Sequence, residues 1–179
     1  MTNATEELLS KINSYNLFNY LLPGVIFSYL VKHYSTIPLK EDTNLVIAAF
    51  LLYFTGMILN RIGSIVIEPF LKKIKFIKFS PYEMYVKAEK HDKKISLLSE
   101  ANNTYRSILS TFLAFVILKS YEIFLFEETT PNNIEVLLIC LVIFTIFLVS
   151  YIKQTNYIAK RVQIVLKKEE ERGGNSQPS

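Results

Sequence analysis

The 179-residue chain is half apolar, has a mean hydropathy of +0.25 and carries 20% charged residues with a formal net charge of +4. This composition is too apolar for an ordinary soluble domain of this length and too charged for a chain buried throughout in lipid. The charges come in blocks between long uncharged runs. This pattern predicts an all-α, four-span helical membrane protein made of two hairpins, with amphipathic cytoplasmic helices between spans two and three and after span four.

The sequence excludes several kinds of chemical site. Its one cysteine, Cys140, cannot form an internal disulfide, and its two histidines, His33 and His91, stand apart from each other. No cluster of histidine, cysteine and carboxylate residues has metal-ligand spacing, and no nucleotide-binding loop, GxSxG, HExxH or CxxC motif occurs. We therefore expect no metal, no cofactor and no enzymatic activity.

The predicted parts follow the blocks of charge. They are an amphipathic lead-in and first hairpin at 1–71 (spans about 16–32 and 45–67), a basic cytoplasmic linker and amphipathic helix at 72–107, a second hairpin at 108–152 (spans about 108–126 and 134–152), and a basic cytoplasmic helix with a disordered tail at 153–179. Each span is close to the roughly 20 residues that a bilayer crossing needs.

Pro23 and Gly24 lie in the middle of the first span. A proline clashes with the carbonyl four residues back, here that of Asn19, and glycine loosens the helix further. The pair therefore predicts a kink. The kink is either a hinge beside a polar path or an ordinary packing kink, with the asparagine hydrogen-bonded to a neighbouring helix; the frequency of proline and glycine in membrane helices favours packing.

The second span carries a small and polar face. Gly56, Asn60 and Ser64 are spaced by four residues, and Gly63 lies beside them. In lipid such a face usually packs against another helix, because close approach and hydrogen bonds replace the missing hydrophobic drive. Together with Arg61, the polar residues form either a vestibule or anionic headgroup site, or an interfacial anchor beside a packing face.

A basic strip follows the second span. Pro69 is expected to end or kink the helix at Glu68. The lysines of the strip alternate with phenylalanine and isoleucine; they are Lys72, Lys73, Lys75 and Lys78. This pattern predicts a segment on the membrane surface that contacts anionic lipid headgroups, and the adjacent span makes lipid a better partner than nucleic acid.

The next helix has the strongest local start signal in the chain. Ser80 can cap it, Pro81 suits the first helical position and Glu83 completes a capping box. Apolar residues at helical spacing continue to Tyr105. Charged residues intrude on this apolar face, so the helix either meets a partner there or is interrupted near His91 and Asp92.

The third span contains Lys119 and Glu122, three residues apart on one face. Charges inside a span are costly and normally face a bundle interior or a cavity. The pair is either an ion or proton site at the mouth of a pore, or a local ion pair that reaches outward to the interface. The fourth span carries no charge from Val136 to Ile152.

The basic residues set the predicted topology. Residues 72–107 hold nine lysines and arginines and the tail from 153 holds six, whereas the loop at 32–44 holds two and the second short loop none. Basic segments stay in the cytoplasm. We therefore expect a multi-pass protein of the bacterial inner membrane whose termini and linker all lie in the cytoplasm.

Two classes of function fit these features. The first is an oligomeric membrane effector or pore-former, of toxin-like or phage-defence type, that is controlled through its cytoplasmic helices. The second is a non-catalytic anchor or scaffold that recruits a cytoplasmic protein. The candidate residues are, for a pore or polar path, Asn19, Asn60, Arg61, Lys119 and Glu122; for hinges, Pro23, Gly24 and Pro69; for helix packing between copies, Gly56, Gly63 and Ser64; and for headgroup contact, the four lysines of the strip.

Overall fold

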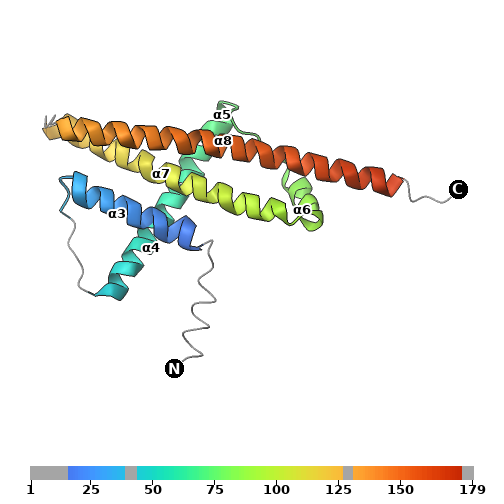
Figure 1. The fold of residues 1–179 in the computed structure, drawn as a ribbon, viewed down its shortest axis with the longest axis horizontal. Coiled ribbons are helices and arrows are strands. Elements are labelled where there is room, and N and C mark those ends of the chain that lie inside the picture. Colours follow the sequence, from blue (N-terminus) through green and yellow to red (C-terminus); the bar gives the residue numbers. More distant parts are fainter. Residues whose placement is uncertain (1–15, 39–43, 127–130, 175–179) are drawn as a thin grey trace, which may run out of the picture.

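The computed structural model describes residues 16–38, 44–126 and 131–174, and the chain within these ranges is helical and has no strands. Two long helices, α7 (Lys94–Phe126) and α8 (Pro131–Gly174), lie side by side along the molecule and run in opposite directions (Figure 1). They form the frame against which the other helices pack. The predicted amphipathic lead-in, residues 1–15, lies outside the described residues.

The remaining helices cross or flank this pair. One continuous helix is made of α4 (Leu45–Ile62), the π-helical η2 (Gly63–Ile67) and α5 (Glu68–Lys73), and it crosses α7 and α8 obliquely (Figure 1). A second consists of the π-helical η1 (Leu17–Leu21) and α3 (Leu22–Tyr34), which pack against α4 and α7. The short α6 (Tyr82–His91) packs against α8.

Three helices of the described chain are long and apolar enough to cross a membrane, as judged by length and composition. They are Leu45–Lys73, Lys94–Leu125 and Asn133–Arg172. This confirms the predicted helical class for the described residues and supports the prediction of membrane-spanning helices. The predicted first span forms a helix, η1 and α3, that is not among these three, so the count of four spans stays a prediction.

Two prolines each follow a wide, π-helical turn. Pro23 lies two residues after the end of η1, and Pro69 two residues after the end of η2. In a regular α-helix a proline clashes with the carbonyl four residues back. In the wide turn the backbone N–H of Glu68 bonds instead to the carbonyl of Gly63, five residues back, and the helix runs on to Lys73. The predicted end of the helix at Glu68 was therefore wrong.

The two N-terminal helices cross at a pair of glycines. A Cβ atom on Gly24 would lie 1.8 Å from the carbonyl oxygen of Leu52, and one on Gly56 would lie 1.6 Å from the carbonyl oxygen of Tyr20. Only glycine fits at either place, because the two backbones are in contact. Gly56 was predicted to pack against a helix, and within this chain that helix is the one made of η1 and α3. The residue of α3 that Gly56 contacts is Gly24, which was predicted to loosen the first span.

The basic strip is held against α8 rather than lying free. Asn156 of α8 donates its side-chain N–H to the carbonyl of Phe76 at 2.9 Å and accepts the backbone N–H of Lys78 at 3.1 Å. Ile77, between these two contacts, is buried. The strip is therefore fixed to the α7–α8 pair by two hydrogen bonds and by the buried side chain of Ile77.

Replacing Asn156 by alanine is expected to release this strip while leaving the helices intact. Two hydrogen bonds are lost, at about 1 kcal/mol each, and the buried side of the strip is exposed more often. Limited proteolysis with trypsin should cut faster after Lys75 and Lys78 in the variant. An equal rate of cutting in the variant and in the natural chain would contradict this contact.

The predicted capping box does not form. Pro81 is the N-cap residue of α6, and no side chain caps this end. The hydroxyl of Ser80 instead donates to the backbone carbonyl of Ala159 on α8, at 3.3 Å. The docking of the strip therefore overrides the local signal, although α6 begins within a residue or two of the predicted place.

Of the two alternatives for this helix, the interruption near His91 and Asp92 is the one that the structure has. The chain leaves α6 at His91 and starts α7 at Lys94. The carboxylate of Asp92 accepts the backbone N–H of Lys94 at 3.0 Å and pairs with Arg161 of α8 at 2.7 Å. The turn is thus fixed at once to the start of α7 and to α8.

Both long helices run through the predicted borders between membrane and cytoplasmic parts. The borders at 107/108 and 152/153 fall inside α7 and α8. α8 also includes Gly173 and Gly174, where disorder was expected; 175–179 lie outside the described residues. We call α6, residues 94–107 of α7 and residues 153–174 of α8 the helical head. Its core includes Ala88, Ile95 and Val162.

Candidate functional site

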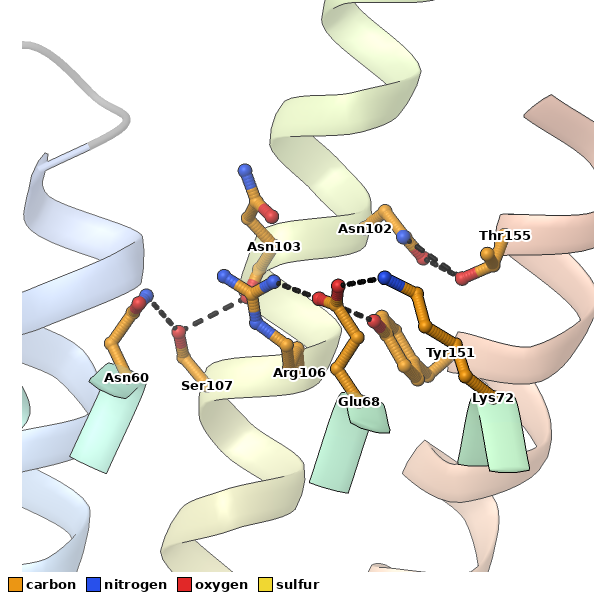
Figure 2. A network of polar contacts seen from close by, with 9 residues as sticks. All are labelled: Asn60, Glu68, Lys72, Asn102, Asn103, Arg106, Ser107, Tyr151 and Thr155. Carbon is orange, nitrogen blue, oxygen red and sulfur yellow. Dashed lines mark hydrogen bonds and ion pairs between the residues drawn. The ribbon is translucent and has the colours of Figure 1, made fainter. Parts of the chain in front are cut away.

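Buried polar side chains gather where the helical head meets the apolar part of the bundle. Glu68 of α5 is at the centre (Figure 2). Its carboxylate pairs with Arg106 of α7 at 2.7 Å and with Lys72 at 2.9 Å, and it accepts the hydroxyl of Tyr151 of α8 at 3.4 Å. The side chains of Glu68 and Arg106 are 17% and 13% exposed, so this ion pair is largely withdrawn from solvent.

Hydrogen bonds between neutral side chains extend this polar layer on both sides (Figure 2). Asn60 of α4 donates to the hydroxyl of Ser107 of α7 at 2.6 Å. On the other side, Asn102 of α7 donates to the hydroxyl of Thr155 of α8 at 3.0 Å. All four side chains are buried. The layer therefore ties α4, α5, α7 and α8 together at one level of the bundle.

A second buried polar cluster lies toward the other end of α7. Lys119 and Glu122 pair at 3.2 Å and are only 4% and 5% exposed. Lys119 also donates to the backbone carbonyl of Tyr34, the last residue of α3. Glu122 accepts hydrogen bonds from the hydroxyl of Ser35 and from the backbone N–H of Thr36, the latter at 3.0 Å. The pair thus caps the end of α3 and fastens it to α7.

The predicted polar-path residues are separated in the structure. Asn19 and Asn60 are buried near the polar layer, on η1 and α4. Lys119 and Glu122 lie in the second cluster, roughly 18 and 22 Å along α7 from Ser107 at 1.5 Å per residue. Arg61 faces outward from α4 and is exposed.

The predicted packing and hinge residues lie on the same two helices. Gly63 is buried against Arg106 of α7, and Ser64 beside it is partly buried. Pro23 is buried, whereas Pro69 is exposed. These positions describe packing within one chain, and packing between copies stays a prediction.

The four lysines predicted to contact headgroups differ in their surroundings. Lys72 pairs with Glu68, and its ammonium lies 4.3 Å from the centre of the Phe79 ring. Lys75 has a backbone φ of 62°, which marks the turn after α5. The side chains of the strip's lysines are exposed and available to anionic lipid; they are Lys72, Lys73, Lys75 and Lys78.

The sequence analysis did not single out Arg106 or Tyr151 as site residues. Both belong to the layer only through tertiary contacts with Glu68. One signal was present: an arginine two residues before the third predicted span follows two asparagines by three and four positions, which places polar groups on one side of the helix at the end of an apolar span. Tyr151 gave no such signal because it ends an uncharged apolar run.

The arrangement pairs buried charges and fixes the helices to one another. Within the described residues no group of three or more histidine, cysteine, aspartate or glutamate side chains could hold a metal ion. A cavity of about 330 Å³ opens between the layer and α6, and its lining includes Tyr85, Ser99 and Asn102. The hydroxyls of Tyr85 and Ser99 are already hydrogen-bonded to each other, at 3.0 Å. Comparisons with protein-family models, curated proteins and solved structures gave no match.

Replacing Glu68 by glutamine is expected to lower the free energy of unfolding by about 2–3 kcal/mol, below the full cost of breaking a deeply buried ion pair because the pair is partly exposed. The change leaves the guanidinium of Arg106 buried without its counter-charge. Unfolding of the purified protein in mixed micelles would measure the loss. The matched control is Glu170→Gln on the exposed tail of α8, and an equal effect of both changes would contradict the bracing role of Glu68.

Proposed function

We propose that the chain is a four-span bacterial inner-membrane protein, with both termini in the cytoplasm, that serves as a non-catalytic anchor for a cytoplasmic protein partner. The observation that carries this proposal is the continuity of α7 and α8. Each helix continues without a break from its apolar segment into the helical head, where α6 packs on both. The head is therefore held rigidly at the membrane.

The head also offers apolar surface. Tyr82 of α6 is 80% exposed and Ile164 of α8 is 55% exposed. Exposed apolar side chains on a segment outside the spans favour a protein contact, whereas those on the spans can be covered by lipid or by another helix. The polar residues of the spans support the same proposal, because Asn60, Lys119 and Glu122 are bonded within the chain.

The test is site-specific photocrosslinking of the full chain in the bacterium that carries it. A photoreactive residue at Tyr82 or Ile164 should give a discrete adduct with one cytoplasmic protein, and the same residue at Val149, on the apolar part of α8, should not. The captured protein should then bind the purified full chain, and binding should fall when Tyr82 is replaced by serine. Adducts with lipid alone at all three positions would refute the anchor function.

A second candidate is the oligomeric effector or pore-former, and one observation favours it. The first half of α4 exposes large apolar side chains, with Leu45 82%, Val46 76% and Phe50 65% exposed. A second copy of the chain could cover this face, and copies arranged in a ring could enclose a path. Controlled expression, followed by a membrane-potential dye, separates the two functions: depolarisation that depends on α4 supports the effector, and an intact potential supports the anchor.

A further inference from the structure

We propose that the groove between η1 and α4 binds one anionic phospholipid, with Arg61 holding the phosphate and the apolar wall holding an acyl chain. The groove has a volume of about 360 Å³. Its wall is apolar apart from Arg61 and the hydroxyl of one tyrosine; the lining residues are Tyr20, Met57, Ile58, Arg61, Ile62, Ile65 and Val66. This inference goes beyond the anchor function and rests only on the membrane orientation proposed with it.

Arg61 has no charged partner among the described residues. The carboxylate at this level, that of Glu68, is already paired with Arg106 and Lys72. Arg61 forms no hydrogen bond or ion pair with any other residue in the structure as described, although it lies on the longest apolar segment of its helix. An arginine at such a place normally carries a counter-charge or extends to the headgroups. The phosphate of a lipid is a counter-charge and lies at the level of the headgroups, and the planar guanidinium can donate two parallel hydrogen bonds to it.

Arg61 lies near one end of the apolar part of the bundle. Its neighbour Asn60 bonds to Ser107, which is roughly 22 Å along α7 from Glu122. A hydrocarbon core of about 30 Å measured from Glu122 therefore ends within two turns beyond Ser107. The side chain of Arg61 can reach the phosphate plane of the cytoplasmic leaflet, and the groove below it lies at acyl-chain depth.

The wall of the groove is formed by exposed apolar side chains from two neighbouring helices. Ile65 and Val66 belong to the π-helical turn η2 and are 70% and 54% exposed. The neighbouring helix η1 adds Tyr20. An acyl chain laid along this wall would cover apolar surface that the chain itself leaves open, next to the one charge that selects an anionic headgroup.

Native mass spectrometry of the purified full chain tests the site, with phosphatidylglycerol as the probe and phosphatidylcholine as the neutral reference. We expect one tightly held phosphatidylglycerol. Arg61→Gln should weaken it about tenfold, because a hydrogen bond to a charged group is lost. Lys87→Gln, which removes an exposed charge from α6 away from the groove, should change it less than twofold. Equal weakening by both changes, or none by Arg61→Gln, would overturn the proposal.

A second pair of variants tests the groove. Ile65→Trp should fill the groove and weaken the binding of phosphatidylglycerol while Arg61 is kept. Val149→Trp, which adds the same bulky side chain to an exposed face of α8, should leave this binding unchanged. Circular dichroism checks that each variant keeps its helical content. Unchanged binding in Ile65→Trp, or competition by glycerol phosphate as strong as by the intact lipid, would show that no acyl chain is bound and would overturn the proposal.

Discussion

Replacing Gly56 by alanine is expected to lower the free energy of unfolding by about 3 kcal/mol, the upper end of the usual cost of overpacking. The added Cβ would lie 1.6 Å from the backbone carbonyl oxygen of Tyr20, and a backbone atom cannot turn aside as a flexible side chain can. The helix of η1 and α3 must move away from α4. Unfolding in mixed micelles, with helix content as the signal, measures the loss.

Gly24 and Gly63 give the controls for this result. Gly24→Ala adds its Cβ to the same crossing, 1.8 Å from the carbonyl oxygen of Leu52. Its effect should not add fully to that of Gly56→Ala, because either change alone separates the helices. Gly63→Ala should cost less, because its closest contact, at 2.9 Å, is a side-chain carbon of Arg106. Equal losses at Gly56 and Gly63 would contradict the glycine crossing.

Replacing Lys119 by methionine should lower the free energy of unfolding by about 3 kcal/mol, the lower end of the cost of removing one partner of a buried ion pair. The carboxylate of Glu122 would keep its hydrogen bonds from Ser35 and Thr36 but would lose its counter-charge while only 5% exposed. The end of α3 would also lose the donor to the carbonyl of Tyr34. The same mixed-micelle unfolding measures this loss.

The control is the double variant that also carries Glu122→Gln. Glutamine keeps an oxygen to accept from Ser35 and Thr36 but carries no charge, so the double variant should be more stable than Lys119→Met alone. This result would show that the uncompensated charge, rather than the lost packing of Lys119, causes the damage. A double variant as unstable as the single one would disprove that explanation.

The helical class and the apolar segments could be predicted because both follow from local patterns. Runs without charge, such as residues 136–152, set the positions of the spans, and the intruding charges near Asp92 marked the turn between α6 and α7. The packing role of Gly56 was predicted from its four-residue spacing to Asn60 and Ser64. Its partner could not be predicted, because spacing along one helix does not say which helix lies opposite.

The errors have two causes, a shift in the backbone hydrogen bonding and contacts distant in sequence, and each overrides a local signal. The helix passes Pro69 because η2 shifts the bonding pattern before it, and Ser80 gives up its capping role because its hydroxyl reaches Ala159. The polar layer was missed for the second reason. Glu68 and Tyr151 are 83 positions apart, and neither has a local pattern that points to the other.

The number and orientation of the spans test the proposed anchor function most directly. In a chain whose Cys140 is replaced by serine, single cysteines at Ser10, Thr36 and Lys87 can be labelled with a membrane-impermeant thiol reagent before and after the cells are opened. Four spans with both termini inside predict labelling of Thr36→Cys in intact cells, and of Ser10→Cys and Lys87→Cys only after opening. Labelling of Ser10→Cys in intact cells would mean that η1 and α3 do not cross the membrane, and would contradict the account.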